Sequence, residues 1–213
     1  MIIRAVADLH GHLPDIKPCD LLLVGGDSLP MYSHEPEYQR EWCGDVFRPW
    51  LDSIDAEVVG IGGNHDFIFQ ADPLVPRDLP WHYADDRMVE IDGLKIWGHP
   101  WVPHLRDWAF FADDPMMEYI VDEIPDDVDI LLSHGPGLRM GSADRVVYGE
   151  HVGCPSLTER VEQIKPKAFV CGHIHEGNGF YRLTVDDGFV PVYNVAHMDK
   201  QYRPVNPVVE IRI

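Results

Sequence analysis

The stretch FVCGHIHEGNG, residues 169–179, places two histidines two residues apart directly after an apolar run. In an extended strand the side chains alternate between faces, so residues i and i+2 leave the same face. His173 and His175 therefore point into one small volume. Two neutral imidazoles gain little from each other, whereas a divalent cation offers a partner to both. Alone, the pair could equally be two satisfied core or surface histidines, so distant parts of the chain must supply the other ligands.

Four further apolar runs have the length of a buried strand and end in glycine or polar residues. They are IIRAVAD from Ile2, DLLLVGGD from Asp20, EVVGIGGNHD from Glu57 and VDILLSHG from Val128. A short run that is apolar throughout is typical of a strand buried on both faces. These runs and residues 167–175 predict five buried strands.

Helical patterns stand between the strands, at residues 35–54, 113–124 and 156–164. Pro36 suits the first position of the first helix, and Pro49 should kink or end it. In the last helix, Ser156 and Glu159 have the spacing of a capping box.

Two hairpins and a final strand complete the pattern. The hairpins turn at Asp92-Gly93 and near Asp187-Gly188, and residues 205–213 have the alternation of a strand. Helices between strands, with hairpins toward the C-terminus, predict an α/β fold with a mixed sheet or two packed sheets.

The polar residues at the strand ends share one property, because each can bind a metal ion. They are Asp8 and His10, Asp27, Asn64, His134, and His173 with His175, and His65 follows Asn64 directly. Each motif alone is also typical of a capped turn or a loop. In open α/β sheets the carboxyl ends of the strands form the active site, so the joint pattern predicts that these side chains meet.

The ligand types restrict the metal. The set contains no thiolate, which argues against a closed structural zinc site. Mixed oxygen and nitrogen donors suit Mn²⁺, Fe, Zn²⁺ or Mg²⁺. Seven ligands are too many for one tetrahedral ion, but they fit two ions that share a bridging carboxylate.

Composition and charge exclude several classes of protein. The chain has 213 residues, of which 45% are apolar, and this is ordinary for a globular protein. Its formal charge of -19 repels phosphate backbones, so a long nucleic acid is a disfavoured partner. The N-terminal sequence lacks the pattern of a signal peptide, and no apolar run is long enough to span a membrane. We therefore expect a cytoplasmic protein whose four cysteines are reduced.

The order Asp-x-His, Gly-Asp, Gly-Asn-His-Asp, His and Gly-His-x-His, between residues 8 and 175, resembles the calcineurin-like metallophosphoesterase superfamily. IWGHPWVPHLRDWAF (96–110), LLSHGPG (131–137) and GHIHEGNG (172–179) are similar to the small metallophosphodiesterases of the brain-expressed animal type and their bacterial and phage relatives. Those proteins are related to the class III cyclic nucleotide phosphodiesterases. The resemblance implies a single metallophosphoesterase domain over residues 1–213, built as an α/β sandwich of two mixed β-sheets flanked by helices.

The resemblance also implies a role for each motif residue. One metal ion would be held by Asp8, His10 and His175, the second by Asn64, His134 and His173, and both by Asp27 as the bridge. His65 would be the catalytic general acid, oriented by Asp66. His12 and His99 are candidate substrate-binding residues, although a loop residue and a packed hairpin end are the plain alternatives. The chain lacks the arginine that follows the bridging aspartate in protein Ser/Thr phosphatases, which disfavours that role.

These features predict a phosphodiesterase with two divalent metal ions, Mn²⁺ being the first expectation. A metal-bridging hydroxide would attack phosphorus, and the substrates would include 2′,3′- or 3′,5′-cyclic nucleotides. No basic residue directly follows a motif, which favours diesters over the more highly charged monoesters. A phosphomonoesterase or nucleotidase is the alternative enzyme, and a non-catalytic metal-binding module is the alternative outside enzymology. The oligomeric state stays open.

Overall fold

The computed structural model describes all 213 residues and contains two mixed β-sheets. The order of strands in the first sheet is β11 (Val209–Ile211), β1 (Ile3–Val6), β2 (Leu21–Gly25), β3 (Glu57–Ile61) and β4 (His82–Tyr83). Strands β1 to β4 are parallel to one another, and β11 pairs with β1 in the antiparallel sense. The final strand that the sequence predicts is thus confirmed as the edge of this sheet.

The second sheet has six strands. Their order is β5 (Met88–Ile91), β6 (Leu94–His99), β7 (Ile130–Ser133), β8 (Ala168–Cys171), β10 (Gly188–Asn194) and β9 (Gly179–Val185). The four inner strands are parallel, and the two predicted hairpins supply the antiparallel edges. In the first hairpin Asp92 and Gly93 both have positive φ, of 49° and 82°, as a two-residue type I′ turn requires. The second turn consists of residues 186 and 187, because Val185 pairs with Gly188.

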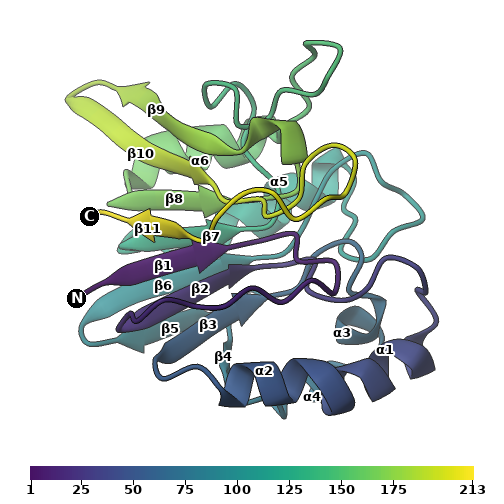
Figure 1. The fold of residues 1–213 in the computed structure, drawn as a ribbon. Coiled ribbons are helices and arrows are strands. Elements are labelled where there is room, and N and C mark those ends of the chain that lie inside the picture. The colour runs from purple at the N-terminus through teal and green to yellow at the C-terminus, as the bar shows by residue number, and fades with distance from the viewer.

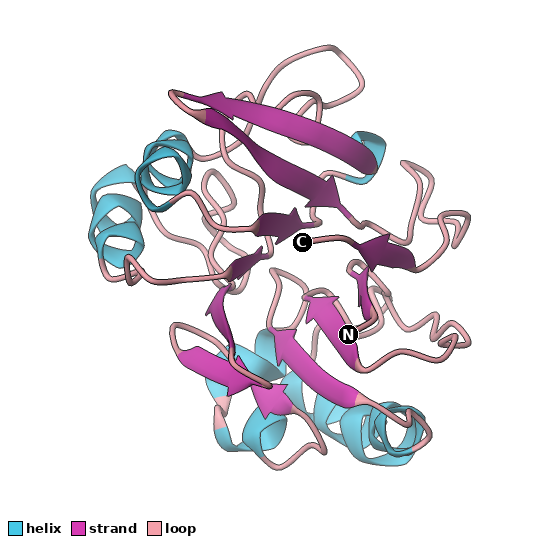
Figure 2. Ribbon diagram, turned by 90° about the vertical axis from the view of Figure 1, so that its left-hand side faces the viewer, coloured by secondary structure: helices cyan, strands magenta, loops and turns pink.

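The sheets pack face to face, and helices cover their outer faces (Figures 1 and 2). The molecule has three apolar cores, because alternate residues of each strand point to opposite faces of its sheet. In β2, Leu21 and Leu23 enter the core between the sheets, whereas Leu22 and Val24 enter the core beneath the helices. Residues of β7 and β8 divide in the same way between the central core and a third core under the other helices. The strands are therefore apolar throughout because both of their faces are buried.

Two groups of helices lie on opposite sides of the sandwich (Figure 2). Beside the first sheet are α1 (Pro36–Trp42), α2 (Arg48–Asp52), α3 (Phe67–Ala71) and α4 (Leu74–Arg77). Beside the second are α5 (Asp114–Asp122) and α6 (Pro155–Ile164). None of these helices is both long and apolar enough to cross a bilayer.

The helices depart from the sequence prediction at one cap. Near Pro49, where a kink or an end was expected, the regular helix is interrupted: a π-helical turn, Cys43–Phe47, stands between α1 and α2, and Pro49 lies in the first turn of α2. The predicted capping box at Ser156 is wrong, since α6 begins at Pro155 with Cys154 in the capping position. Proline is favoured at the first helical position because its φ is already helical and its missing N–H would have no partner there.

The two sheets meet at the end of β1, and this junction brings the strand ends together. The backbone N–H of Ala7 donates to Val195 O (3.0 Å), and Ala7 O accepts from the N–H of His197 (2.8 Å). The segment after β1 therefore lies beside the segment after β10, although the two are far apart in the sequence. The N–H of Val195 also donates to Cys171 O at the end of β8 (2.7 Å), which brings that strand end to the same place. The polar ends of β1, β2, β3, β7 and β8 consequently surround one site.

Candidate metal centre

Asp8, His10 and His175 form the first cluster of metal-binding side chains, and all three are buried. The Nε2 atoms of the two histidines are 3.4 Å apart, and His175 Nε2 lies 3.5 Å from Asp8 Oδ1. The backbone N–H of His173 donates to both oxygens of Asp8, at 3.0 and 2.9 Å, and so fixes this carboxylate.

Asp27, His134 and His173 form the second cluster. His134 Nε2 lies 3.4 Å from Asp27 Oδ2 and 3.0 Å from Asn64 Oδ1, so the carboxamide belongs to the same group. The rings of His134 and His173 are centred 5.1 Å apart.

The Asp27 carboxylate lies between the two clusters. Its Oδ2 atom is 3.8 Å from His10 Nε2 on one side and 3.4 Å from His134 Nε2 on the other. This is the position that a ligand shared by two ions would need.

Backbone hydrogen bonds orient two of the histidines. His134 Nδ1 lies 2.9 Å from Gly25 O, and His175 Nδ1 lies 3.1 Å from Asp199 O. When each Nδ1–H donates to its carbonyl, Nε2 is left as a free acceptor that faces the cluster. Such hydrogen bonds commonly set the tautomer of histidines that bind metals.

Four of the cluster residues have a left-handed backbone. The φ angles are 55° at Asp8, 44° at His10, 52° at Asp27 and 66° at His173. This conformation is uncommon for residues other than glycine, and where several such residues gather at one site the surrounding structure holds them in place. Here all four side chains belong to the two clusters.

The charges within the centre are unevenly distributed. Burial alone would raise the pKa of Asp27, but the adjacent His134 and His65 lower it well below its usual value. Burial would lower the pKa of His134, but Asp27 raises it to about 9. Burial lowers the pKa of His10 to about 4 and that of His173 to about 3. In the metal-free centre Asp27 is therefore ionised and His10 and His173 are neutral, as cation binding requires, whereas His134 holds a proton that a bound cation would displace.

The donor set fits divalent metal ions. Within each of the clusters the candidate ligand atoms lie within 4.8 Å of one another, and they are carboxylate oxygens and imidazole nitrogens. The four cysteines are free thiols outside these clusters. Mixed oxygen and nitrogen donors in two adjacent groups are consistent with a dinuclear site.

His65 lies at the edge of the centre, and its backbone is held at both ends. Its N–H donates to Asp27 Oδ1 (2.7 Å), and its carbonyl accepts from Gln39 Nε2 (2.7 Å). The ring Nε2 lies 4.0 Å from Asp27 Oδ2. Burial lowers the pKa of His65.

Asp66 does not contact the His65 ring, which corrects the predicted orienting role. Its carboxylate accepts the backbone N–H groups of Ser28 (3.3 Å), Leu29 (3.0 Å) and Gly63 (2.9 Å). Asp66 thus joins the loop after β2 to the loop after β3. It shapes the site without touching the imidazole.

The sequence analysis missed four residues beside His65. The rings of His34, Trp108 and Tyr202 lie near the His65 ring. The fourth residue, Gln39, donates a hydrogen bond to the His65 carbonyl. They come from loops and helix α1, outside the strand-end motifs. A search based on strand ends could not find them.

A cavity of about 210 Å³ opens onto the centre. Its lining consists of Asp27, Asn64, His65, Leu105, Trp108, His173, His175 and Tyr202. His12 and His99 are not part of this lining. His12 is exposed on the loop after β1. His99 is fully buried within the sandwich, so the predicted contact between its side chain and a substrate is wrong.

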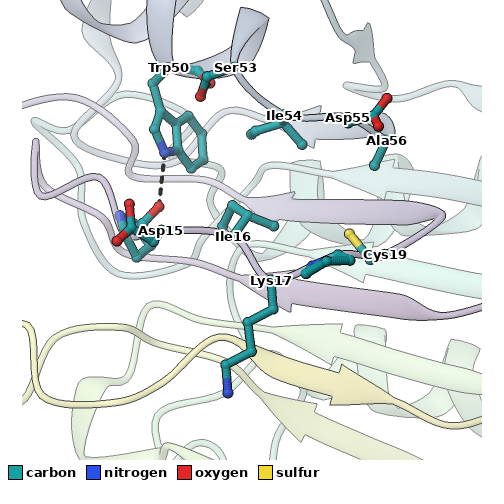
Figure 3. Close-up of a pocket in the computed structure, with 11 residues that line it drawn as sticks. Asp15, Ile16, Lys17, Cys19, Trp50, Ser53, Ile54, Asp55 and Ala56 are labelled. Atoms are coloured by element: carbon teal, nitrogen blue, oxygen red, sulfur yellow. Dashed lines mark hydrogen bonds between the residues drawn. The ribbon is translucent and has the colours of Figure 1, made fainter.

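A second hollow, of about 310 Å³, lies between segment 14–19 and the residues that follow α2 (Figure 3). Trp50 Nε1 donates to Pro14 O (3.0 Å) on one wall, and Ile54 and Cys19 form part of the rest. No histidine lines this hollow. It is separate from the metal centre.

Comparison with known proteins gives the family. The family model described as calcineurin-like phosphoesterase matches residues 1–177, and the chain belongs to this family. It is therefore a member of a superfamily of metal-dependent phosphoesterases.

Individual relatives support this assignment. The chain is 31% identical over 196 residues to metallophosphoesterase domain-containing protein 1 of Homo sapiens, covering 78% of this chain and 58% of the human protein. A UPF0046 protein of Caenorhabditis elegans is 34% identical over 243 residues, covering 92% of this chain and 57% of the relative. The chain thus spans somewhat more than half the length of these relatives. Phosphopantetheinyl hydrolase from Mycobacterium tuberculosis shares the fold at 15% identity, with a TM-score of 0.63 and coverage of 99% of this chain and 95% of that one.

Proposed function

We propose that this chain is a two-metal phosphodiesterase that cleaves small phosphodiesters, cyclic nucleotides among them. The observation that carries the proposal is the position of Asp27, whose Oδ2 lies 3.8 Å from a ligand atom of one cluster and 3.4 Å from a ligand atom of the other. Asp27 also lines the cavity, so a phosphoryl group there would meet both clusters.

Seven side chains would bind the two metal ions. Asp8, His10 and His175 would hold one ion, Asn64, His134 and His173 the other, and Asp27 both. When bound, the two ions would supply a nucleophilic hydroxide near neutral pH and neutralise charge on the phosphoryl oxygens. Mn²⁺ is our first choice for the ions, and the donor set also accommodates Fe, Zn²⁺ or Mg²⁺.

His65 is suited to donate a proton to the leaving oxygen. Its Nε2 faces the cavity, and its backbone is fixed by Asp27 and Gln39. Because burial lowers the pKa of His65, the imidazolium is a strong acid, but less of it exists at high pH. Cleavage of substrates with poor leaving groups should therefore slow as the pH rises.

The lining of the cavity favours diesters over monoesters. It contains no lysine and no arginine, and the whole chain carries a formal charge of -19. A monoester brings one more negative charge than a diester, and the lining has no lysine or arginine to offset it. The alternative, a phosphomonoesterase or nucleotidase on the same site, would have to rely on the metal ions alone.

Two aromatic walls suit an aryl group or a nucleobase. The Trp108 ring is centred 4.4 Å from the His65 ring, and the Tyr202 ring is centred 4.8 Å from the His175 ring. Both side chains line the cavity. Flat aromatic surfaces beside a phosphoryl site can stack on the organic part of a substrate.

A substrate panel tests the proposal. Metal-stripped protein reloaded with Mn²⁺ is given an aryl diester, an aryl monoester, and 2′,3′- and 3′,5′-cyclic nucleotides. We expect the diesters to be hydrolysed faster than the monoester, and Asp27→Asn to abolish both activities. The matched control is Asp78→Asn, since Asp78 is an exposed surface residue paired with Arg48. A clear preference for the monoester would select the alternative, and inactivity toward every ester would reject both.

A further inference from the structure

A second imidazole stands behind the imidazole of His65. His34 Nε2 lies 2.9 Å from His65 Nδ1, which is a hydrogen-bonding distance. His34 belongs to the segment between β2 and α1, which the strand-end motifs do not include. Its ring is partly buried and packs against Phe67 (centroids 5.0 Å apart) and Trp108 (5.1 Å).

The two nitrogens of His65 face opposite partners. Nδ1 faces His34, whereas Nε2 is directed toward the metal centre, 4.0 Å from Asp27 Oδ2. A neutral imidazole has one N–H and one acceptor nitrogen, so the partner of Nδ1 influences which nitrogen carries the proton. The direction of Nε2 is set by the same contact, because the ring is planar.

No carboxylate oxygen stands beside His65 Nδ1, where His34 lies. The Asp66 oxygens accept backbone N–H groups, and Asp27 meets the backbone N–H of His65. Those contacts and the Gln39 hydrogen bond fix the main chain of His65 but leave rotation of its ring free. His10 and Trp108 pack against the ring, and His34 is the side chain at hydrogen-bonding distance from its Nδ1.

We propose that His34 is a positioning residue for His65, and this inference rests on the phosphodiesterase function proposed above. His34 Nε2 accepts the Nδ1–H of His65 and holds the ring so that Nε2–H faces the leaving oxygen. As the bond from phosphorus to that oxygen breaks, its electron pair leaves with the oxygen, which takes the Nε2 proton. The Nδ1–H stays on His65, still bound to His34, and water returns a proton to Nε2.

Three variants separate hydrogen bonding from packing. His34→Phe keeps an aromatic ring against Phe67 and Trp108 but has no acceptor. His34→Gln offers an amide oxygen that can accept the hydrogen bond. His82→Phe is the matched control, because His82 is exposed on β4 and paired with Glu57.

The kinetic test uses Mn²⁺-loaded protein with a phenyl diester, which has a poor leaving group, and a dinitrophenyl diester, which has a good one. We expect His34→Phe to lower kcat for the phenyl diester about tenfold, a part of what a general acid contributes. The effect on the dinitrophenyl diester and on KM should be small, and His34→Gln should recover most of the loss. Equal losses on both substrates, no loss at all, or a His34→Gln variant as slow as His34→Phe would each overturn the inference.

A spectroscopic readout tests the contact without catalysis. In metal-free protein labelled with ¹⁵N-histidine, the ring nitrogen shifts report the tautomer of His65, assigned by its loss in His65→Ala. We expect Nδ1 to carry the proton in the wild type at pH 8 and to lose this preference in His34→Phe. An unchanged tautomer would reject the positioning role.

The two proposals fail in different ways. If the wild type hydrolyses diesters and Asp27→Asn does not, but His34→Phe equals the wild type, the inference alone fails. If the wild type is inactive on every ester while the tautomer changes as expected, the proposed function fails and the His34–His65 contact stands.

Discussion

The buried pair of His134 and Asp27 makes the stability of the metal-free protein depend on pH in a specific window. Both side chains are almost completely inaccessible, and the Nε2 to Oδ2 distance is 3.4 Å. Although burial opposes the charge on His134, Asp27 raises its pKa to about 9 from the ordinary value of 6.5. The folded chain therefore retains a proton that the unfolded chain releases.

The sign and size of the effect follow from this difference. A raised histidine pKa contributes stability that is complete below pH 6.5 and disappears as the pH rises through about 9. At about 1.36 kcal/mol for each pKa unit, the His134 proton alone should make the free energy of unfolding fall by about 3 kcal/mol across this window. The raised pKa of His175 acts in the same direction, as do those of Asp66 and Asp85, which burial raises to about 8 and about 7. The lowered pKa values of His10 and His173, about 4 and 3, act only below pH 6.5, where each of these two histidines contributes a rise of stability with pH.

Urea denaturation between pH 6 and 9.5, with a chelator present, measures the effect. His134→Asn should be less stable overall, and its free energy of unfolding should fall by about 3 kcal/mol less than that of the wild type. Asp27→Asn should flatten the curve in the same way, because its carboxylate is the cause of the shift. His82→Asn, at an exposed position, should keep the wild-type curve.

Addition of saturating Mn²⁺ should remove the decline. A bound cation takes the place of the His134 proton, so metal affinity should instead increase with pH up to about 9. If the difference between the wild type and His134→Asn stays constant from pH 6.5 to 9, the ion pair is not charged as described, and the electrostatic account of the centre is wrong.

Three other predictions concern the centre and the core. In Gly63→Ala the new Cβ would lie 2.4 Å from the Asp27 backbone nitrogen and displace this ligand, so the Mn²⁺ content after dialysis should drop. Gly44→Ala, where nothing lies within 4 Å of the new Cβ, should retain the metal, and equal Mn²⁺ contents in the two variants would refute the prediction. Phe47→Ala removes a fully buried ring and should cost about 3–5 kcal/mol in urea denaturation, a loss under about 1 kcal/mol being incompatible with that burial. Tyr202→Leu should raise KM for aryl and nucleotide diesters several-fold with unchanged Mn²⁺ content, and an unaltered KM would exclude stacking at this wall.

Local pattern in the sequence was sufficient for most of the scaffold. Runs such as DLLLVGGD are apolar throughout because each strand is covered on both faces, and the structure has strands at all five of them. The Asp92-Gly93 turn was predictable because few residue pairs accept two consecutive positive φ angles. The predicted metal ligands follow these strands directly, and parallel strands bring their carboxyl ends to one edge.

Helix boundaries were less predictable because competing local signals have similar energies. Ser156 and Glu159 have the spacing of a capping box, yet α6 begins at Pro155, where proline needs no N–H partner. Pro49 was expected to kink or end a helix, and the structure has a π-helical turn just before it and a new helix, α2, with Pro49 in its first turn.

The surroundings of His65 were decided by tertiary structure alone. Asp66 is adjacent to His65 in sequence, but its carboxylate is taken by three backbone N–H groups. His34, 31 positions earlier, reaches the ring instead. His99 has a polar side chain, yet the residues packed around the end of β6 bury it completely. A sequence states which groups can form hydrogen bonds, whereas only the packing of distant segments decides which of them meet.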